Sequence, residues 1–134
     1  MDRNSKTSCD QRFVVSHFDE KDFKATSLRG YLQKRDLGVR DATGGMAIAH
    51  VVRAARPCEP GDLPGMHQHM ADFQYFYVLK GWQRMLIDGH GEVTVRTNDG
   101  WLQPPAIKHQ VLEYSDDLEV LCISMPAEFD TEDA

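Results

Sequence analysis

Short stretches of alternating apolar and polar residues dominate the chain after residue 45. Alternation of this kind places every second side chain on one face of a β-strand. The clearest stretches are QYFYVLK, WQRMLID, EVTVRT, HQVLEY and LEVLCISM, and a weaker one is MAIAHVVRA. Turn residues separate them at intervals of about eight to twelve residues, which is typical of an antiparallel sandwich or barrel. The pattern therefore predicts an all-β fold of about seven short strands.

One later stretch and the region before residue 46 follow the pattern less well. WLQPPAIKH contains a proline pair, which predicts an edge strand or a bend. FVVSHFDEKDF fits a short strand and a turn, and SLRGYLQKRDLG fits a short helix or an irregular arm. Residues 41–45 form a turn by composition. We therefore expect an N-terminal arm at residues 1–45 and a barrel at residues 46–134.

Composition limits the function without naming it. The chain has 134 residues, of which 41% are hydrophobic and 27% charged, so it suits a single globular core. Its formal net charge of −6 disfavours nucleic acid as a partner. No apolar run reaches the ~20 residues that a bilayer requires, and the polar N-terminus lacks the apolar part of a secretory signal. We therefore expect no contact with a membrane. The three cysteines form no close pair, which argues against a disulfide framework and, without an export signal, leads us to expect a cytoplasmic protein.

Two histidines precede the most apolar stretch of the chain. His67 and His69 are two residues apart, so in a strand both imidazoles project from one face and can chelate a divalent ion. Gln74 lies an odd number of residues after His69, which requires a turn or bulge at residues 70–73. Gln74 would then face both histidines from the next strand.

A third nitrogen ligand is expected at His109. This residue follows a proline-rich bend and opens the stretch HQVLEY, a position that aims one side chain into a barrel mouth. A lone histidine in a strand is usually exposed or hydrogen-bonded in a core, but three histidines and a glutamine together favour a metal. His17 and His90 fall in the arm and in a hairpin loop. His50 could face inward behind the site.

The segment from Gly61 to Gly81 resembles the first sequence motif of the cupin superfamily. Its two glycines, the His67-x-His69 pair and Gln74 fit every spacing of that motif, with glutamine where the motif has glutamate.

The second cupin motif is matched in part. Pro104 and His109 fit it, whereas its two glycines and its asparagine are replaced by Asn98, Ala106 and Glu113. The resemblance covers roughly residues 46–125 and leaves out the N-terminal 45 residues.

The resemblance implies a small, single-domain, RmlC-like cupin. Such a protein is an antiparallel double-stranded β-helix, or jelly-roll barrel, of about six to eight strands with one metal inside. The family's ligand positions carry over to His67, His69, Gln74 and His109. Cupins commonly form homodimers through N-terminal strands, so residues 1–45 are expected to serve dimerisation.

The glutamine changes the chemistry expected of such a site. An amide carries no charge and accepts no proton near pH 7, although its oxygen can bind a metal. Three imidazoles and an amide leave the full charge on the ion, which favours Lewis-acid chemistry. Zn, Ni, Fe, Mn and Co all suit these ligands. A glutamine here resembles the uronate-linearising sugar isomerases, and similar small cupins include polyketide cyclases. It is less like the quercetin dioxygenases, which use the glutamate.

The wall beside the metal is expected to be mostly apolar, which suits a small, partly apolar or cyclic organic molecule. The side chains expected to line it are Phe76, Val78, Gln83, Met85, Ile87 and Val111. Two carboxylates are candidates for acid–base catalysis. Glu113 would share the inward face of His109, and Asp72 lies in the turn before Gln74.

Three functions fit these residues. The first is a metal-dependent isomerase, cyclase or lyase that uses the ion as a Lewis acid. The second is a dioxygenase, which needs a redox-capable ion with an open coordination position. The third is a non-catalytic module that binds a small molecule or a metal. The three histidines and the glutamine argue against a cupin without metal. Of the three functions, we expect an enzyme.

Overall fold

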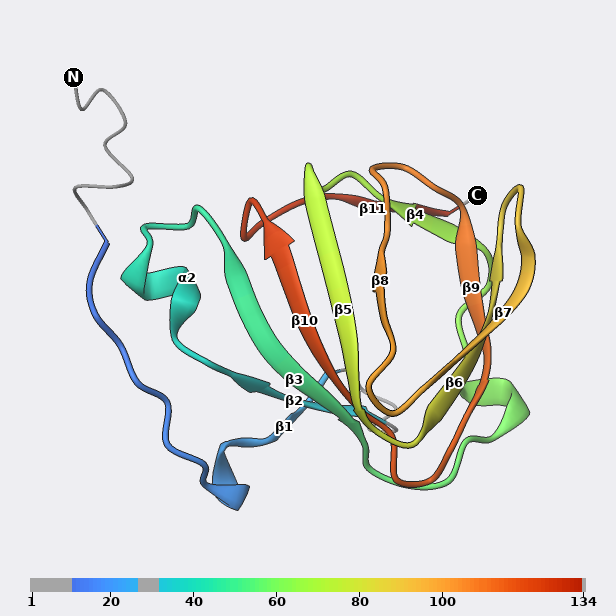
Figure 1. Ribbon diagram of the computed structural model, residues 1–134, viewed down its shortest axis with the longest axis horizontal. Coiled ribbons are helices and arrows are strands. Elements are labelled where there is room, and N and C mark those ends of the chain that lie inside the picture. The colour runs from blue at the N-terminus through green and yellow to red at the C-terminus, as the bar shows by residue number, and fades with distance from the viewer. Residues whose placement is uncertain (1–10, 27–31, 134) are drawn as a thin grey trace.

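Two antiparallel sheets face each other in the computed structural model, which describes residues 11–26 and 32–133 (Figure 1). The first sheet has the order β1 (Lys24–Ala25), β2 (Leu32–Asp36), β3 (Ile48–Ala54), β10 (Glu119–Met125), β5 (Phe73–Lys80) and β8 (Gly100–Leu102). The second has the order β11 (Thr131–Asp133), β4 (His67–His69), β9 (His109–Tyr114), β6 (Trp82–Ile87) and β7 (Gly91–Arg96). The sheets do not close into a continuous barrel, but the predicted all-β jelly-roll architecture is confirmed.

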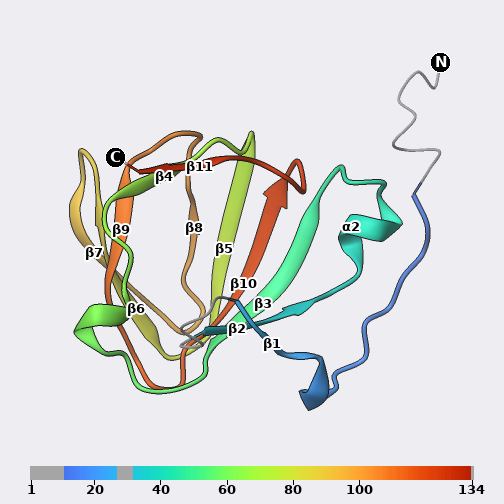
Figure 2. The same ribbon diagram turned by 180° about the vertical axis from the view of Figure 1, so that it is seen from behind.

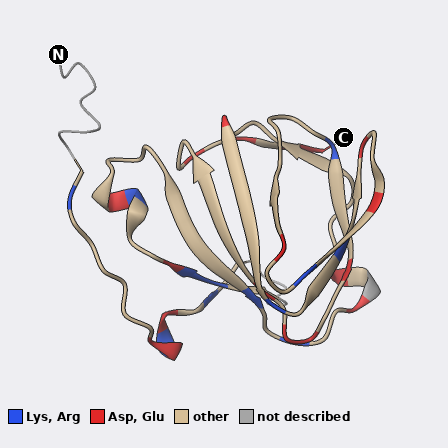
Figure 3. Ribbon diagram, in the orientation of Figure 1, with Lys and Arg blue, Asp and Glu red and all other residues tan. Residues whose placement is uncertain are grey.

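Helices contribute little to the fold. In the described residues they are two 3-10 turns, η1 (Glu20–Asp22) and η2 (Pro60–Asp62), and one short α-helix, α2 (Val39–Ala42). No helix in the described ranges is long and apolar enough to cross a bilayer. Charged residues lie mainly on the loops, the short helices and the strand ends, while the middles of β5 and β10 carry few (Figure 3).

The stretch SLRGYLQKRDLG is a strand where the structure describes it. Residues 32–36 form β2, which pairs with β3 in the register Leu32↔Ala54 to Asp36↔His50, so the helix considered for this stretch is wrong there. Residues 27–31 lie outside the described residues. The edge of β3 offers unpaired backbone groups, and pairing with them outweighs a weak helical pattern. This part of the expected arm therefore extends the first sheet.

Residues 11–19 run as an extended segment beside α2 and pair with no strand of the described chain. The backbone N–H and the guanidinium of Arg12 donate to the carbonyls of Ala42 and Asp41, at 2.8 and 2.7 Å. Phe13 is 92% exposed and Phe18 68%. Figures 1 and 2 both show this segment on the side of β2 and α2, away from β4 and β9. The short strand expected here is absent from the described residues.

A glycine holds the tight connection between β5 and β6. Gly81 has φ +81°, and a side chain there would clash with Oγ of Ser115. Glycine is therefore the residue that this close approach allows. The proline-rich stretch after Gly100 also behaves as expected, because β8 pairs only with β5 and forms an edge.

One end of the space between the sheets is closed by an apolar core, several of whose side chains also line the cavity between the sheets. Its members are Val78, Met85, Val95, Tyr114, Leu118, Val120 and Cys122, each at most 6% exposed. Burial raises the pKa of the Cys122 thiol to about 12, so this cysteine behaves as a small core residue.

Candidate metal centre

Three histidines converge at the other end of the space between the sheets. His67 and His69 lie on β4, and His109 opens β9 directly opposite His67 in the pairing of these strands. One ring nitrogen of each lies within 4.8 Å of the others, and the ring centroids are 4.3 to 4.9 Å apart. Two strands that are distant in sequence therefore bring together the three side chains that the sequence analysis singled out.

Each imidazole is held by a hydrogen bond at its Nδ1 atom. His67 Nδ1 lies 2.8 Å from the carbonyl of Gly65, and His109 Nδ1 lies 2.9 Å from the carbonyl of Ile107. A carbonyl oxygen can only accept, so Nδ1 carries the proton in both rings and Nε2 keeps a lone pair. Metal-binding histidines are oriented in the same way, by an oxygen partner at the nitrogen that faces away from the ion.

The third imidazole is oriented by the C-terminal strand. His69 Nδ1 lies 2.8 Å from Oγ1 of Thr131, which pairs with His69 across β4 and β11. The ring of Phe129 packs edge-on against His69 at 5.7 Å between centroids. Neither residue was predicted from the sequence, because a strand of three residues is too short to show a clear alternation. Their contacts fix the ring of His69.

Burial favours the neutral forms of His69 and His109. Burial first, and then the neighbouring imidazoles of His109 and His67, lower the pKa of His69 to about 4. Burial also lowers the pKa of His109, a change partly opposed by the hydrogen bond to Ile107 and reinforced by His67. Neutral imidazoles with free lone pairs are what a metal ion requires, because protonated ligands must lose their protons before binding.

The predicted turn separates β4 from β5 and places Gln74 on the inner face of the first sheet. The side chain of Gln74 is buried, with 5% exposure. Its Nε2 donates to Oγ of Ser124 at 3.4 Å, and its Oε1 accepts from Nε2 of Gln103 at 3.2 Å. Gln103 Nε2 in turn lies 3.4 Å from Nε2 of His109. A single amide group therefore links Gln74 to the histidines.

Gln103 is a site residue that the sequence analysis overlooked. It is only 5% exposed, and its Oε1 accepts from the indole N–H of Trp101 at 3.4 Å. A signal was present in the sequence, because Gln103 shares a strand face with Trp101. A polar residue beside an inward aromatic ring needs a buried partner.

Glu113 points out of the barrel, unlike the expectation that it would share the inward face of His109. Its carboxylate accepts from Nη2 of Arg84 at 3.2 Å on the outer surface. The cause is a bulge in β9: Glu113 pairs with Arg84, but Val111 pairs with the next residue, Met85. The extra residue, Leu112, reverses the alternation, so Tyr114 faces the core in place of Glu113.

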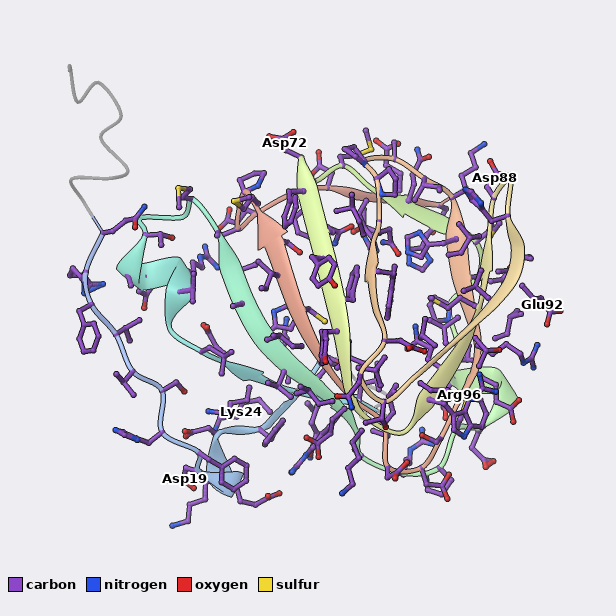
Figure 4. All side chains as sticks on the ribbon, viewed as in Figure 1. Asp19, Lys24, Asp72, Asp88, Glu92 and Arg96 are labelled. Atoms are coloured by element: carbon purple, nitrogen blue, oxygen red, sulfur yellow. The ribbon has the colours of Figure 1, made fainter. Side chains whose placement is uncertain are left out.

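Asp72 lies in the turn before β5 and is exposed. Figure 4 shows it at the outer end of β5, away from the space between the sheets. Its backbone N–H donates to the carbonyl of Met125 at 2.8 Å, so the residue shapes the turn that positions Gln74.

The histidines line one end of a cavity of about 220 Å³ between the sheets. Of the expected wall residues, four line it: Phe76, Gln83, Met85 and Val111. Val78 is completely buried in the core behind the wall, and Ile87 packs against that core. Trp101 stacks on Phe76, with centroids 4.7 Å apart and 13° between the planes.

The described residues around this cavity include no lysine, arginine, aspartate or glutamate. A larger surface hollow, of about 690 Å³, lies along residues 126–130 and holds none of the three histidines. The smaller cavity is therefore the one in which a ligand would meet the imidazoles.

Comparison with solved structures finds close similarity of fold at low sequence identity. KdgF from Halomonas sp. matches with a TM-score of 0.67 and 19% identity, over 85% of this chain and 95% of that one. The polyketide cyclase RemF from Streptomyces resistomycificus matches with 0.64 and 15%, over 90% and 85% of the two chains. The DMSP lyase DddQ from Ruegeria pomeroyi matches with 0.63 and 15%, over 90% and 61%.

No family model matches the sequence, and no curated protein sequence matches it. The structural similarities, at identities of 15 to 19%, speak for the fold alone. They agree with the motif spacing around His67 and with the two facing sheets, and together these observations show that this chain has the cupin fold.

Proposed function

We propose that this protein holds one divalent transition-metal ion through His67, His69 and His109, with the carboxamide oxygen of Gln74 as a fourth ligand. The observation that carries the proposal is the orientation of the imidazoles. Their Nδ1 atoms are all occupied by oxygen partners, while ring nitrogens of the three lie within 4.8 Å of one another. A cluster of imidazoles with ring nitrogens gathered at one place is a poor structural core and a good cation site.

The ligand atoms are neutral nitrogen and oxygen, a set that Zn, Ni, Fe, Mn and Co all accept. When bound, such an ion supplies a Lewis acid that polarises a carbonyl or enol oxygen of a small molecule. The chain supplies the rest. The stacked rings of Phe76 and Trp101 form an apolar wall that excludes water, and Gln103 presents an amide N–H beside His109.

The proposed activity is isomerisation, cyclisation or elimination on a small and mostly apolar oxygen compound. The described cavity wall has no carboxylate to act as a strong base and no cation to hold a second anionic group. Two neighbours in fold are named as a polyketide cyclase and a DMSP lyase, which supports this choice of reaction type for the proposal.

Metal analysis tests the first part of the proposal. Protein without a histidine tag, stripped with a chelator and reloaded with each candidate metal in turn, should bind about one ion per chain. His109→Ala should abolish binding, whereas His90→Ala, which changes an exposed histidine, should bind as the wild type does. Equal binding by both variants would refute the assignment of the centre.

Turnover assays separate the remaining alternatives. Loss of small carbonyl or polyketide-like substrates without oxygen consumption supports the Lewis-acid activity. Oxygen uptake by the iron- or nickel-loaded protein with flavonols or diketones supports a dioxygenase instead. Metal and ligand binding without turnover supports a non-catalytic module.

The homodimer suggested by the family resemblance remains part of the proposal. Exposed apolar side chains line the N-terminal segment, namely Phe13, Val14, Val15 and Phe18, each at least 46% exposed. A second copy of the chain that covered them would remove this surface from water. Light scattering after size-exclusion chromatography should give a dimer for the wild type and a monomer for the double variant Phe13→Ser, Phe18→Ser. A monomeric wild type would refute the dimer.

A further inference from the structure

A chain of three hydrogen bonds crosses the first sheet behind the histidines. The indole N–H of Trp101 donates to Oε1 of Gln103, Nε2 of Gln103 donates to Oε1 of Gln74, and Nε2 of Gln74 donates to Oγ of Ser124. Gln74, Gln103 and Ser124 are each at most 5% exposed. The chain is therefore shielded from water, which strengthens its hydrogen bonds and penalises any reversal of an amide.

The indole sets the direction of the whole chain. The Nε1 atom of tryptophan can only donate, so Gln103 must turn its oxygen toward Trp101 and its NH₂ group toward Gln74. Gln74 must then present its oxygen to Gln103, and its NH₂ group faces Ser124. The two amides therefore have assigned orientations.

The NH₂ group of Gln103 has a second hydrogen, and it faces the histidine centre. Gln103 Nε2 lies 3.4 Å from Nε2 of His109, which holds a lone pair because Nδ1 donates to Ile107. A cation at the histidines would take up that lone pair. The second N–H of Gln103 would then be a buried donor that needs another acceptor at the same place.

We propose that Gln103 recognises the ligand of this protein, by donating a hydrogen bond to a negatively charged or strongly polarised oxygen beside His109. The proposal rests on the proposed metal site and adds the chemical class of the ligand. Because the described cavity wall holds no charged side chain, we expect that oxygen to be the only charged group of the molecule. Carbonyl compounds that form enolates belong to this class. Trp101 acts through Gln103 as a positioning residue.

A test can use simple probes on the whole, tag-free protein loaded with Co²⁺. Acetohydroxamate offers a negatively charged oxygen, and imidazole binds metals through nitrogen with no oxygen acceptor. The visible spectrum of cobalt reports the dissociation constant of each. Gln103→Met removes the donor with little change in size, and Trp101→Phe removes the group that orients it. Gln110→Met is the matched control, because Gln110 neighbours His109 on β9 but does not line the cavity.

The expected result is selective. Gln103→Met should keep its cobalt and weaken acetohydroxamate by about tenfold or more, the effect of losing a hydrogen bond to a charged oxygen. Trp101→Phe should weaken it less, and neither change should affect imidazole. Gln110→Met should bind both probes as the wild type does. General damage to the site would weaken both probes together, and would therefore overturn the proposal.

Other outcomes of the same experiment would refute the role of Gln103 or the metal site. Cobalt retained by Gln103→Met, with acetohydroxamate bound within about twofold of the wild type, refutes the role of Gln103 and leaves the metal site intact. Should Gln103→Met fail to fold or to hold cobalt, Trp101→Phe takes its place, and unchanged acetohydroxamate binding there refutes the role. A wild-type protein that binds no cobalt refutes the proposed metal site, and the role of Gln103 with it.

Discussion

The two ends of the space between the sheets are built from the same strands but differ in chemistry. On β5, Gln74 faces inward at the histidine end and Val78 at the closed end. On β10, Ser124 faces inward at the histidine end and Val120 at the closed end. A separation of four residues along a strand keeps the same face, so only the residue type changes.

The histidine end is polar, with a hydrogen-bond partner for each buried group that forms it. The closed end is apolar and holds Val78 with no exposed surface at all. Burial of apolar area stabilises a fold, whereas a satisfied buried polar group contributes little beyond offsetting its own desolvation. The difference teaches that stability should depend on the closed end and ligand binding on the histidine end.

The largest effect on stability is expected from Met85→Ala, where the apolar core also forms part of the cavity wall. Met85 is 2% exposed, and its truncation should lower the free energy of unfolding by about 2–5 kcal/mol through the cavity it leaves. Metal affinity should stay unchanged. Urea unfolding of the metal-free protein measures the first quantity, and Met70→Ala, which changes a 43% exposed methionine, is the control. Equal losses in the two variants would contradict the comparison.

Gln74→Glu, at the histidine end, is expected to lower the stability less than Met85→Ala does and, unlike Met85→Ala, to change metal affinity. A carboxylate between Gln103 and Ser124 is costly to bury, so the metal-free variant should be roughly 1–3 kcal/mol less stable than the wild type. The same negative charge should tighten metal binding. Thermal unfolding with and without Zn²⁺ shows both changes, as a lower starting Tm and a larger upward shift. A shift smaller than that of the wild type would place Gln74 outside the ligand set.

The smallest effect concerns His50, an inward imidazole outside both ends. Its Nδ1 is buried without a partner in the described chain, and burial, with Lys34 adding and Asp36 opposing, lowers its pKa from 6.5 to about 4. The unfolded chain then binds a proton more readily than the folded one. Stability contributed by neutral His50 is therefore present above pH 6.5 and is lost as pH falls toward 4.

His50→Leu removes that contribution. Between pH 6.5 and 4, the metal-free variant should lose less stability than the wild type, by on the order of 1 kcal/mol. Denaturant unfolding at several pH values provides the measurement. Parallel stability curves for the two proteins would show that His50 does not titrate differently in the folded state.

The sequence could predict the features that depend on local alternation and spacing. The strand that holds Gln74, and the position of His67 and His69 on one face, follow from a period of two. The turn between His69 and Gln74 follows from their odd spacing. Features that depend on partners distant in the sequence could not be predicted in this way. β2 forms because β3 offers an edge, and Thr131 reaches His69 from a strand too short to show a pattern.

The acid–base candidates show the same limit. A single extra residue, Leu112, turns Glu113 to the outside, and a bulge of this kind leaves no mark in the pattern. Gln103 was not predicted because its signal is a single spacing of two residues from Trp101, directly before a proline pair that ends the alternation.

The most direct test of the metal centre is to follow the six histidines by long-range ¹H–¹⁵N NMR during addition of Zn²⁺ to the tag-free protein. His67, His69 and His109 should each bind through Nε2 and keep the proton on Nδ1. The change should be complete at about one ion per chain. His17, His50 and His90 should not change. Binding through Nδ1, or a response that leaves out His109, would contradict the account.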